Sequence, residues 1–508
     1  MLFNKSKFVN KLKHCLAKIV VNKEFYLSNY SDVGVAKVDP VKHYAKYWKS
    51  SPIRAPNSTI SRLLFVVSPV VVGWYAASGR ANLEWLAIFR VRFKELHWAN
   101  KPFQRRIAVR VVKKITDAEV LQNSTVAEYF GQRLRVFRAW RDDAPWLTRT
   151  QIEPEANYYF NEVHPVGWRN KTRRREVIIP PLTHITINDA TIFGTAQIMA
   201  GNRYVVEEPA ADPKFSFVAG QQDIILNLDR TGASAIAKIP AITEAIPEGI
   251  LLGGRCAKNY FHFMLEYLTK GYIFERCNLI DQIPLVVTDD LFPSQYEAIN
   301  IIFPGIPLFK RPSNTALKVD LLHTASVMNY LPDAGEVPDW MKSGLRDASL
   351  KWLRDRVLSN TPLDAIRQSR GRYFLSRRFG RSITNAAEVE DIFLQRGFEV
   401  IDPGSLSFVE QINLFRTAEC IAGPTGAAFT NMIFCNPGTK IIALSSRHSM
   451  MSVFQNIAHF ANCDYHQIAT PGPKIDLYRN RPPSVAQIHA NFSIDTGSLS
   501  DFLSLNIR

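Results

Sequence analysis

Short apolar runs and amphipathic segments alternate along residues 372–444 in a way that predicts a parallel sheet wound with helices. Helical spacing of apolar positions marks residues 386–396 and 407–416. In the second helix Ser407 precedes Glu410 by three residues, the spacing of a capping box. Ligands of wound sheets bind beyond the carboxyl ends of the strands, so we expect a site at that edge. The predicted strands are 372–376, 398–401, 419–422 and 440–444.

Basic and small residues follow two of these strands at the predicted edge. Arg377, Arg378 and Arg381 come after the first strand, and the third strand runs into a turn of small residues that includes Thr425, Gly426 and Ala427. Guanidinium groups match phosphate oxygens, and a helix that begins in the turn offers free N–H groups to an anion. Each feature also has an ordinary alternative, a solvated basic face and a plain turn. A diphosphate pocket is therefore one of two open interpretations.

A second chemical landmark precedes this region. Residues 175–250 carry short β runs, after which a predicted helix begins near Asn259. That start places His262 and Glu266 four residues apart on one helix face. A histidine beside a carboxylate is an acid–base arrangement. The alternative is a core helix in which His262 caps and Glu266 binds backbone. The predicted β runs are 176–179, 185–187, 191–193, 204–206 and 223–226.

The length of 508 residues predicts two or three domains, because a single core rarely grows that large. We expect a basic helix and a small module first, then a helical region that faces a membrane surface or an acceptor. Two large α/β domains and a tail follow. The expected boundaries are 1–60, 61–160, 161–335, 336–475 and 476–508.

The formal net charge of +16 indicates anionic partners. Nucleotide-sugars and an anionic membrane face both fit this charge. Nucleic acid ranks last, since the sequence shows no nucleic-acid-binding module, zinc-ligand spacing or aromatic RNA-binding signature. The six cysteines are scattered without a C-x-x-C pair, which favours a reducing compartment over a disulfide framework.

Two segments near the N-terminus bear on membrane contact. Residues 1–21 place apolar positions at helical spacing among lysines, a pattern typical of a helix on an anionic membrane or of an ordinary surface helix. The most apolar run, residues 63–77, is 15 residues long, whereas a spanning helix needs about 20. We therefore expect a buried or membrane-dipping segment there rather than a true span.

The ordered motifs of residues 372–444 resemble the C-terminal half of glycosyltransferase family 61. The landmark from Asn259 to Glu266 resembles that family's N-Y-F-H segment, and residues 22–57 resemble a small module of bacterial surface-glycan glycosyltransferases. One departure is Thr425, where the family usually has histidine. The matching motifs are Arg381-Ser382-Ile383-Thr384-Asn385, Gly397-Phe398-Glu399-Val400, Leu406-Ser407-Phe408-Val409-Glu410-Gln411, Gly423-Pro424-Thr425-Gly426-Ala427-Ala428-Phe429-Thr430-Asn431 and Pro437-Gly438.

The resemblance implies an α/β fold of GT-B type, with two Rossmann-like domains facing a cleft, a helical N-terminal extension and a tail that returns to the first domain. It implies an inverting transfer in which His262 is the base and Glu266 orients it or serves instead. Asn259 is the candidate acceptor ligand. Donor-binding candidates are Arg377, Arg378, Arg381, Thr425, Gly426 and Ala427 for the diphosphate, with Glu410 and Asn431 for ribose or sugar.

No D-x-D motif occurs, and Asp289 and Asp290 are adjacent instead. We therefore expect no metal and no cofactor, with arginines and a helix N-terminus stabilising the leaving diphosphate. The expected partners are a nucleotide-sugar and a bacterial surface or capsular glycan, free or lipid-linked, at the inner face of the cytoplasmic membrane. The rival is a non-catalytic glycan-binding scaffold on a transferase fold, which Thr425 and the long basic N-terminus motivate.

Overall fold

The structure is a computed structural model in which the chain divides into two units, Met1–Phe130 and Gly131–Arg508. It describes Asp39 and most of residues 132–507. The predictions for residues 1–21, 22–57 and 63–77 therefore lie outside the described residues, and all elements below belong to the second unit. Between 132 and 507 the undescribed positions are 162–163, 168–173, 208–224, 229–232, 238, 255, 281–282, 332–342, 362–370, 379, 450–451, 471–486 and 488.

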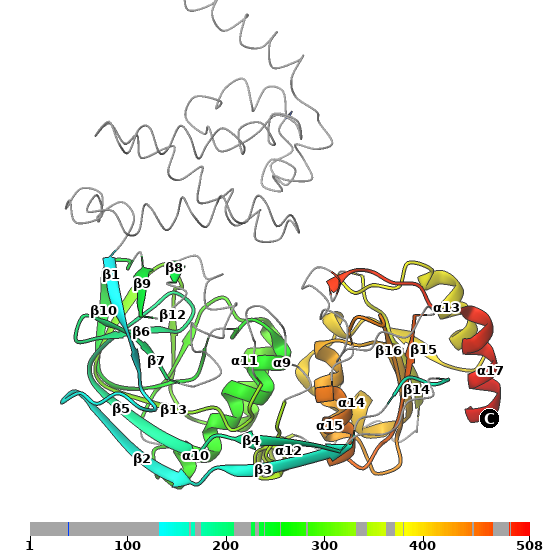
Figure 1. Ribbon diagram of the computed structural model, residues 1–508, viewed down its shortest axis with the longest axis horizontal. Helices are drawn as coiled ribbons and strands as arrows, with labels where there is room; N and C mark the ends of the chain where they lie inside the picture. Colours follow the sequence, from blue (N-terminus) through cyan, green and yellow to red (C-terminus); the bar gives the residue numbers. More distant parts are fainter. Residues whose placement is uncertain are drawn as a thin grey trace, which may run out of the picture. The chain divides into compact units, whose positions relative to one another are not determined.

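A five-stranded parallel sheet forms the second lobe of this unit, in the order β15-β14-β16-β17-β18 (Figure 1). The predicted wound parallel sheet is confirmed here. The helix expected after the small-residue turn is a 3₁₀ helix, η9 (Ala427–Phe434). The strands are β14 (Gly371–Leu375), β15 (Glu399–Ile401), β16 (Ala418–Pro424), β17 (Lys440–Ser445) and β18 (Asp464–Ala469). The helices are α13 (Ala386–Leu394), η8 (Pro403–Ser405), α14 (Phe408–Thr417), α15 (Ser452–Phe460) and α17 (Thr496–Asn506).

The first lobe is built on a mixed sheet of eleven described strands. Neighbours pair in parallel along β12-β11-β10-β13 and between β1 and β7, whereas the remaining pairs are antiparallel. Within this sheet, a continuous run of parallel pairs, as expected of a Rossmann-like lobe, is limited to β12-β11-β10-β13. Its sheet strands are β1 (Gln132–Arg138), β2 (Leu147–Glu153), β5 (Leu182–Phe193), β6 (Gln197–Ala200), β7 (Arg203–Val206), β8 (Ile225–Leu228), β9 (Ser234–Ala237), β10 (Ile242–Leu251), β11 (Leu285–Thr288), β12 (Leu308–Arg311) and β13 (Ala316–Ala325).

Two details of the first lobe differ from the expected organisation. β1 and β2 lie before residue 161, the expected start of this domain, yet they pair with β7, β9 and β5. The runs expected at 185–187 and 191–193 are parts of one strand, β5. Helices near the sheet are α9 (Tyr260–His262), the π-helix η4 (Phe263–Tyr267), η5 (Leu268–Lys270), α10 (Gly271–Arg276), α11 (Pro293–Ile302) and, leading out of the lobe, α12 (Asp347–Asn360).

The two lobes share one buried core. Phe263 and Phe274 from the first lobe belong to the same cluster of buried side chains as Phe408, Phe429 and Ile441 from the second. A hairpin of β3 (Ala156–Asn161) and β4 (Arg174–Ile179) also crosses between them (Figure 1). In the loop of this hairpin, the Val166 N–H donates to the Gln467 carbonyl at 2.8 Å. The lobes therefore meet through packed side chains and backbone bonds.

The C-terminal helix α17 stays on the second lobe. Leu499 and Leu503 are completely buried in a cluster with Phe374 and Phe393, and α17 contacts α13 (Figure 1). The expectation that the tail returns to the first domain is wrong for this helix. Its apolar face matches the hydrophobic outer surface of the second sheet, which would otherwise be exposed.

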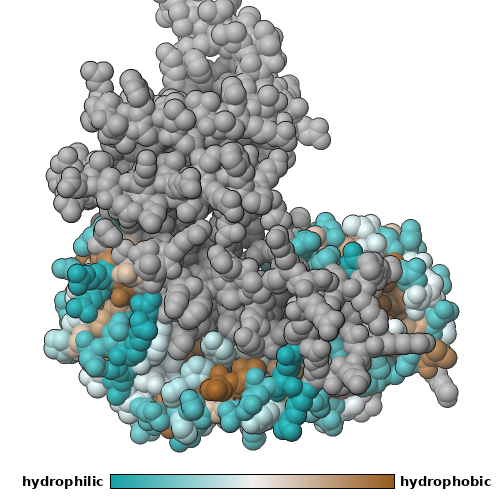
Figure 2. Space-filling view, viewed as in Figure 1, coloured by the Kyte–Doolittle hydropathy of each residue, from teal (hydrophilic) through white to brown (hydrophobic). Residues whose placement is uncertain are grey.

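Hydrophilic residues cover most of the described surface on the face shown in Figure 2, with smaller apolar areas between them. Within the described residues, none of the helices combines the length and the apolar character that crossing a bilayer requires.

Candidate active site

The first candidate group lies at the start of α9. The Asn259 side chain accepts a hydrogen bond from the Phe261 N–H at 3.0 Å and so caps the helix. His262 ends α9, and its Nδ1 lies 2.8 Å from Oε2 of Glu266. The predicted pairing four residues apart is therefore present. Asn259, the acceptor candidate, is exposed beside this pair, although its side-chain oxygen already serves the helix.

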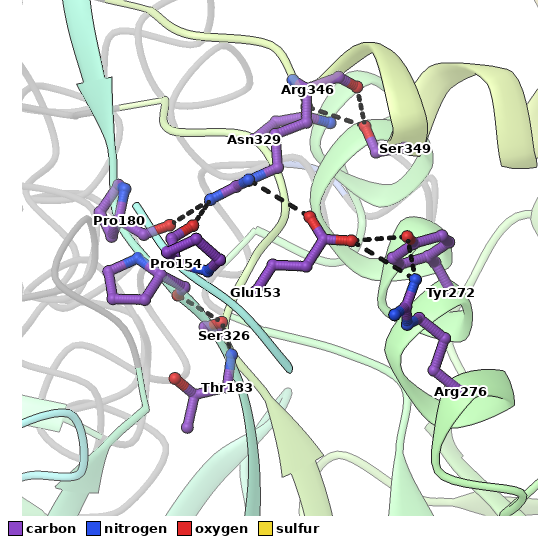
Figure 3. Close-up of polar contacts among 11 residues, drawn as sticks. Glu153, Pro154, Pro180, Thr183, Tyr272, Arg276, Ser326, Asn329, Arg346 and Ser349 are labelled. Atoms are coloured by element: carbon purple, nitrogen blue, oxygen red, sulfur yellow. Dashed lines mark hydrogen bonds and ion pairs between the residues drawn. The ribbon is translucent and has the colours of Figure 1, made fainter. Parts of the chain in front are cut away.

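Glu266 lies in a single π-helical turn, η4, whose shape is held from outside. The Asn329 side chain donates from Nδ2 to the Leu265 carbonyl at 2.7 Å. Its Oδ1 accepts from the Arg346 N–H and the Ser349 hydroxyl, both at 2.9 Å (Figure 3). Arg346 is itself fixed by the carbonyls of Pro154 and Pro180 (Figure 3). Burial lowers the pKa of this guanidinium. A π-turn is uncommon and tends to mark functional positions, and here a buried polar network maintains it.

The second group lies at the carboxyl edge of the second sheet. Arg377 follows β14, and Thr425 follows the neighbouring strand β16. The Arg377 side chain donates from Nε to the Gly380 carbonyl at 2.5 Å and from Nη1 to the Thr425 carbonyl at 3.5 Å. Burial lowers the pKa of Arg377. The structure thus places this arginine against the small-residue turn, as the sequence predicted.

Gly426 is where the guanidinium and the turn come together. A Cβ built on Gly426 would collide with Nη1 of Arg377, so only glycine leaves room for this approach. Its φ of −176° is extended backbone, and the requirement is one of space rather than of backbone conformation. Ala427 begins η9, whose first turn has no side-chain cap. Arg377 thus lies against the turn that begins η9, and a guanidinium beside a helix N-terminus is an arrangement that suits an anion.

The three candidate arginines do not behave alike. Burial, with the neighbouring charge of Arg377 second, lowers the pKa of Arg381 to about 10. When two arginines lie so close that each disfavours the positive charge of the other, an anion between them stabilises both charges. Arg378 is exposed, whereas Arg377 and Arg381 are partly buried. Thr425 is buried, and its N–H donates to the Leu444 carbonyl at 2.8 Å.

Two predicted donor ligands have other roles. Glu410 accepts from the Ser407 N–H at 2.8 Å while Ser407 Oγ accepts from the Glu410 N–H at 3.2 Å, which confirms the capping box. Asn431 is completely buried, with its Oδ1 accepting from Tyr260 and its Nδ2 donating to Gln411. Helix capping and a buried hydrogen-bond chain therefore explain these residues better than contact with ribose or sugar.

Sequence reasoning missed a third loop at the same edge. Arg447 and His448 form the turn after β17, and the Ser446 hydroxyl accepts from the His448 N–H at 3.1 Å. Burial, and the charge of Arg447 after it, lower the pKa of His448. Basic residues soon after a buried strand were the sequence pattern that revealed Arg377. The same pattern is present here and would have revealed this loop.

The adjacent acids Asp289 and Asp290 follow β11, and Asp290 forms an ion pair with Lys258. Among the described residues, no three His, Cys, Asp or Glu side chains form a group that could hold a metal ion.

Comparison with known proteins identifies the region that carries both groups. Residues 260–442 match the model of the family described as Glycosyltransferase 61. This segment therefore resembles glycosyltransferase family 61. It runs from α9 into β17 and contains the His262–Glu266 pair and the Arg377–Gly426 edge, and the chain is accordingly a glycosyltransferase. A search of curated proteins finds no match.

Proposed function

We propose that this family 61 glycosyltransferase has GT-B architecture and inverts configuration as it transfers a sugar from a nucleotide-sugar to a bacterial surface or capsular glycan, without a metal ion. The observation that carries the proposal is the placement of two complementary groups on contacting elements. The His262–Glu266 pair lies on α9 and η4, and the Arg377–Gly426 edge lies at the start of η9, which contacts α9. One group moves a proton and the other holds an anion.

In the proposed reaction, the acceptor hydroxyl attacks the anomeric carbon of the donor sugar. Because Nδ1 of His262 faces the Glu266 carboxylate, Nε2 is left to take the hydroxyl proton as the new C–O bond forms. The bond between the anomeric carbon and the diphosphate oxygen breaks on the opposite side, which inverts the configuration. Glu266 stabilises the imidazolium that results.

The leaving diphosphate carries the developing negative charge. Arg377, Arg381 and the first N–H groups of η9 supply positive charge and donors at one place. Preorganised groups of this kind stabilise a leaving group without a metal ion. Two arginines and a helix N-terminus are therefore the basis for proposing metal independence.

The basic net charge supports attachment to an anionic surface. With +16 over the chain, we place the enzyme at the inner face of the cytoplasmic membrane, where lipid-linked glycan acceptors reside.

Calorimetric titration with a panel of nucleotide-sugars, first in EDTA and then with Mn²⁺, tests the donor site. We expect selective binding in EDTA. Arg377→Ala should weaken it about 10- to 100-fold, the usual effect of losing a hydrogen bond to a charged group. Arg372→Ala is the matched control, because Arg372 lies at the opposite end of β14 and pairs with Glu419. Binding only with Mn²⁺ would contradict metal independence, and equal affinities of the two variants would remove Arg377 from the site.

The base is tested separately from the donor site. His262→Ala should lower kcat about 100- to 10,000-fold, the usual contribution of a general base. Donor affinity should stay within a few-fold, since the side chain belongs to the first lobe. Full activity of this variant would rule out His262 as the base.

A further inference from the structure

A chain of buried and partly buried hydrogen bonds connects the two halves of the proposed site. Tyr260, two residues before His262, donates from its hydroxyl to Oδ1 of Asn431 in η9 at 2.7 Å. Asn431 donates from Nδ2 to Oε1 of Gln411 in α14 at 3.0 Å, and Gln411 donates to the Leu406 carbonyl at 3.2 Å. Because each amide is bonded at both ends, its orientation is fixed.

The start of α14, the helix that carries Gln411, also bonds to a side chain of the first lobe. Glu297 of α11 accepts from the Phe408 N–H at 2.6 Å and from the Val409 N–H at 3.4 Å. These are the first two helical residues of α14, so a carboxylate from one lobe caps a helix of the other. Phe261, next to Tyr260, also packs its ring 5.7 Å from that of Phe454 in α15. The start of α9 is thus attached to the second lobe by both polar and aromatic contacts.

We propose that Tyr260 is a positioning residue for sugar transfer, acting through Asn431. The inference rests on the proposed function, in which His262 removes a proton while the turn that begins η9 holds the diphosphate. Asn431 lies four residues after Ala427, within η9 itself, and is completely buried. The Tyr260–Asn431 bond therefore joins the element that carries the base to the element that receives the leaving group.

The physical reason is that reaction rate depends steeply on the distance between reacting groups. An error of about 1 Å in placing a catalytic group can cost about 100-fold in rate. His262 and the η9 turn belong to different lobes, so no single element fixes their separation. A hydroxyl and two primary amides with defined partners provide that constraint, whereas apolar packing alone tolerates small slips.

Tyr260→Phe removes only the hydroxyl and keeps the ring. Tyr296→Phe is the matched control, because the Tyr296 hydroxyl donates to the Thr288 carbonyl at 2.6 Å within the first lobe. We expect Tyr260→Phe to lower kcat at least about 10-fold while the donor Kd changes less than about threefold. Tyr296→Phe should change neither quantity beyond that range. Both are measured on the full chain, with folded fractions checked by thermal unfolding.

Amide hydrogen exchange of the ligand-free protein gives a readout that does not depend on donor binding. Tyr260→Phe should raise exchange in Ala427–Phe434, across the lobe boundary, and Tyr296→Phe should not. Gln411→Met removes the far end of the chain, and its effect on kcat should not add to that of Tyr260→Phe.

The outcomes separate this inference from the proposed function. Unchanged exchange in Ala427–Phe434, or a loss of kcat no larger than that of Tyr296→Phe, overturns the positioning role even if the donor binds as proposed. Raised exchange in a protein whose wild type binds no nucleotide-sugar supports the connection between the lobes and overturns the proposed donor site instead.

Discussion

Nδ1 of His262 lies 2.8 Å from Oε2 of Glu266, and the carboxylate is completely buried while 19% of the imidazole side chain remains exposed. A buried carboxylate next to a partly exposed imidazole defines a direction for proton movement. In the proposed reaction Nε2 of the ring meets the substrate, while the Glu266 carboxylate holds Nδ1. Under that proposal Glu266 acts on the substrate only through His262.

Replacing Glu266 with glutamine tests that arrangement. The glutamine amide can donate to Nδ1, which would place the imidazole proton on Nε2 and leave no base for the acceptor. We expect kcat to fall about 100- to 10,000-fold, with little change in donor affinity. Initial rates over a range of acceptor concentrations, together with calorimetry of the donor, measure the two effects. A variant with wild-type kcat would show that the carboxylate is only a packing partner.

Gly426 offers a test of the anion site that needs no charge change. An alanine Cβ would displace the Arg377 guanidinium, and the extended φ of −176° adds no backbone strain. Gly426→Ala should therefore weaken donor binding about 10-fold or more, while the protein remains folded. In an Arg377→Ala background the same substitution should have little further effect, because the group that it displaces is gone.

Gly497→Ala is the matched control for that experiment. Gly497 is the second residue of α17, where an added Cβ makes only an ordinary contact with Asp495. Alanine there should leave donor affinity unchanged and raise the free energy of unfolding by up to about 1 kcal/mol, since alanine favours helix more than glycine. Equal donor affinities for the Gly426→Ala and Gly497→Ala proteins would contradict the placement of Arg377 in the site.

Local pattern predicted the second lobe well. The strands and the α13 and α14 helices of residues 372–444 are adjacent in sequence, and their buried faces repeat at regular spacing. The Ser407–Glu410 capping box and the His262–Glu266 pair depend on residues three or four apart, so sequence alone reveals them. The same locality explains why the turn at Gly426 was recognised.

Contacts across the sequence were not predictable in this way. Asn431 was interpreted as a donor ligand because it lies in a motif near the site, yet the Tyr260 hydroxyl donates to its side-chain oxygen. Tyr260 and Asn431 are 171 positions apart, and no periodicity reveals a bond over that separation. The position of α17 depends on which apolar sheet surface is left unpacked by the other helices. That surface exists only in the assembled lobe, so the sequence pattern does not reveal it.

The revised role of Glu410 predicts an effect on stability rather than on binding. Glu410→Ala removes the acceptor of the Ser407 N–H and should cost about 1 kcal/mol in the free energy of unfolding. Donor affinity should stay within about twofold of wild type, because losing a direct charged hydrogen bond would cost more than that. Glu410→Gln retains the capping oxygen and should restore most of the stability. Urea denaturation and calorimetry provide the two readouts, and a tenfold loss of affinity in both variants would return Glu410 to the donor site.

Three titratable side chains on neighbouring strands predict how stability depends on pH. His184 on β5 stacks on His323 of β13, with Nε2 3.1 Å from Nδ1, and His323 lies 2.8 Å from Glu248 of β10. Burial, and the charge of His323 after it, lower the pKa of His184 to about 4. The unfolded chain takes up this proton near pH 6.5 and the folded chain only near pH 4, so stability is lost as the pH falls through that interval.

The size of the loss follows from the shift between the two pKa values. A shift from 6.5 to about 4 corresponds to roughly 3 kcal/mol of unfolding free energy. His184→Gln cannot take up the proton, so the slope of that free energy against pH should flatten between pH 6.5 and 4, whatever the substitution costs at neutral pH. His459→Gln, at an exposed position on α15, is the control for removing an imidazole elsewhere. If the slope of the unfolding free energy against pH is unchanged in His184→Gln, the folded protein does not hold His184 in its neutral form. Other groups then cause the acid sensitivity.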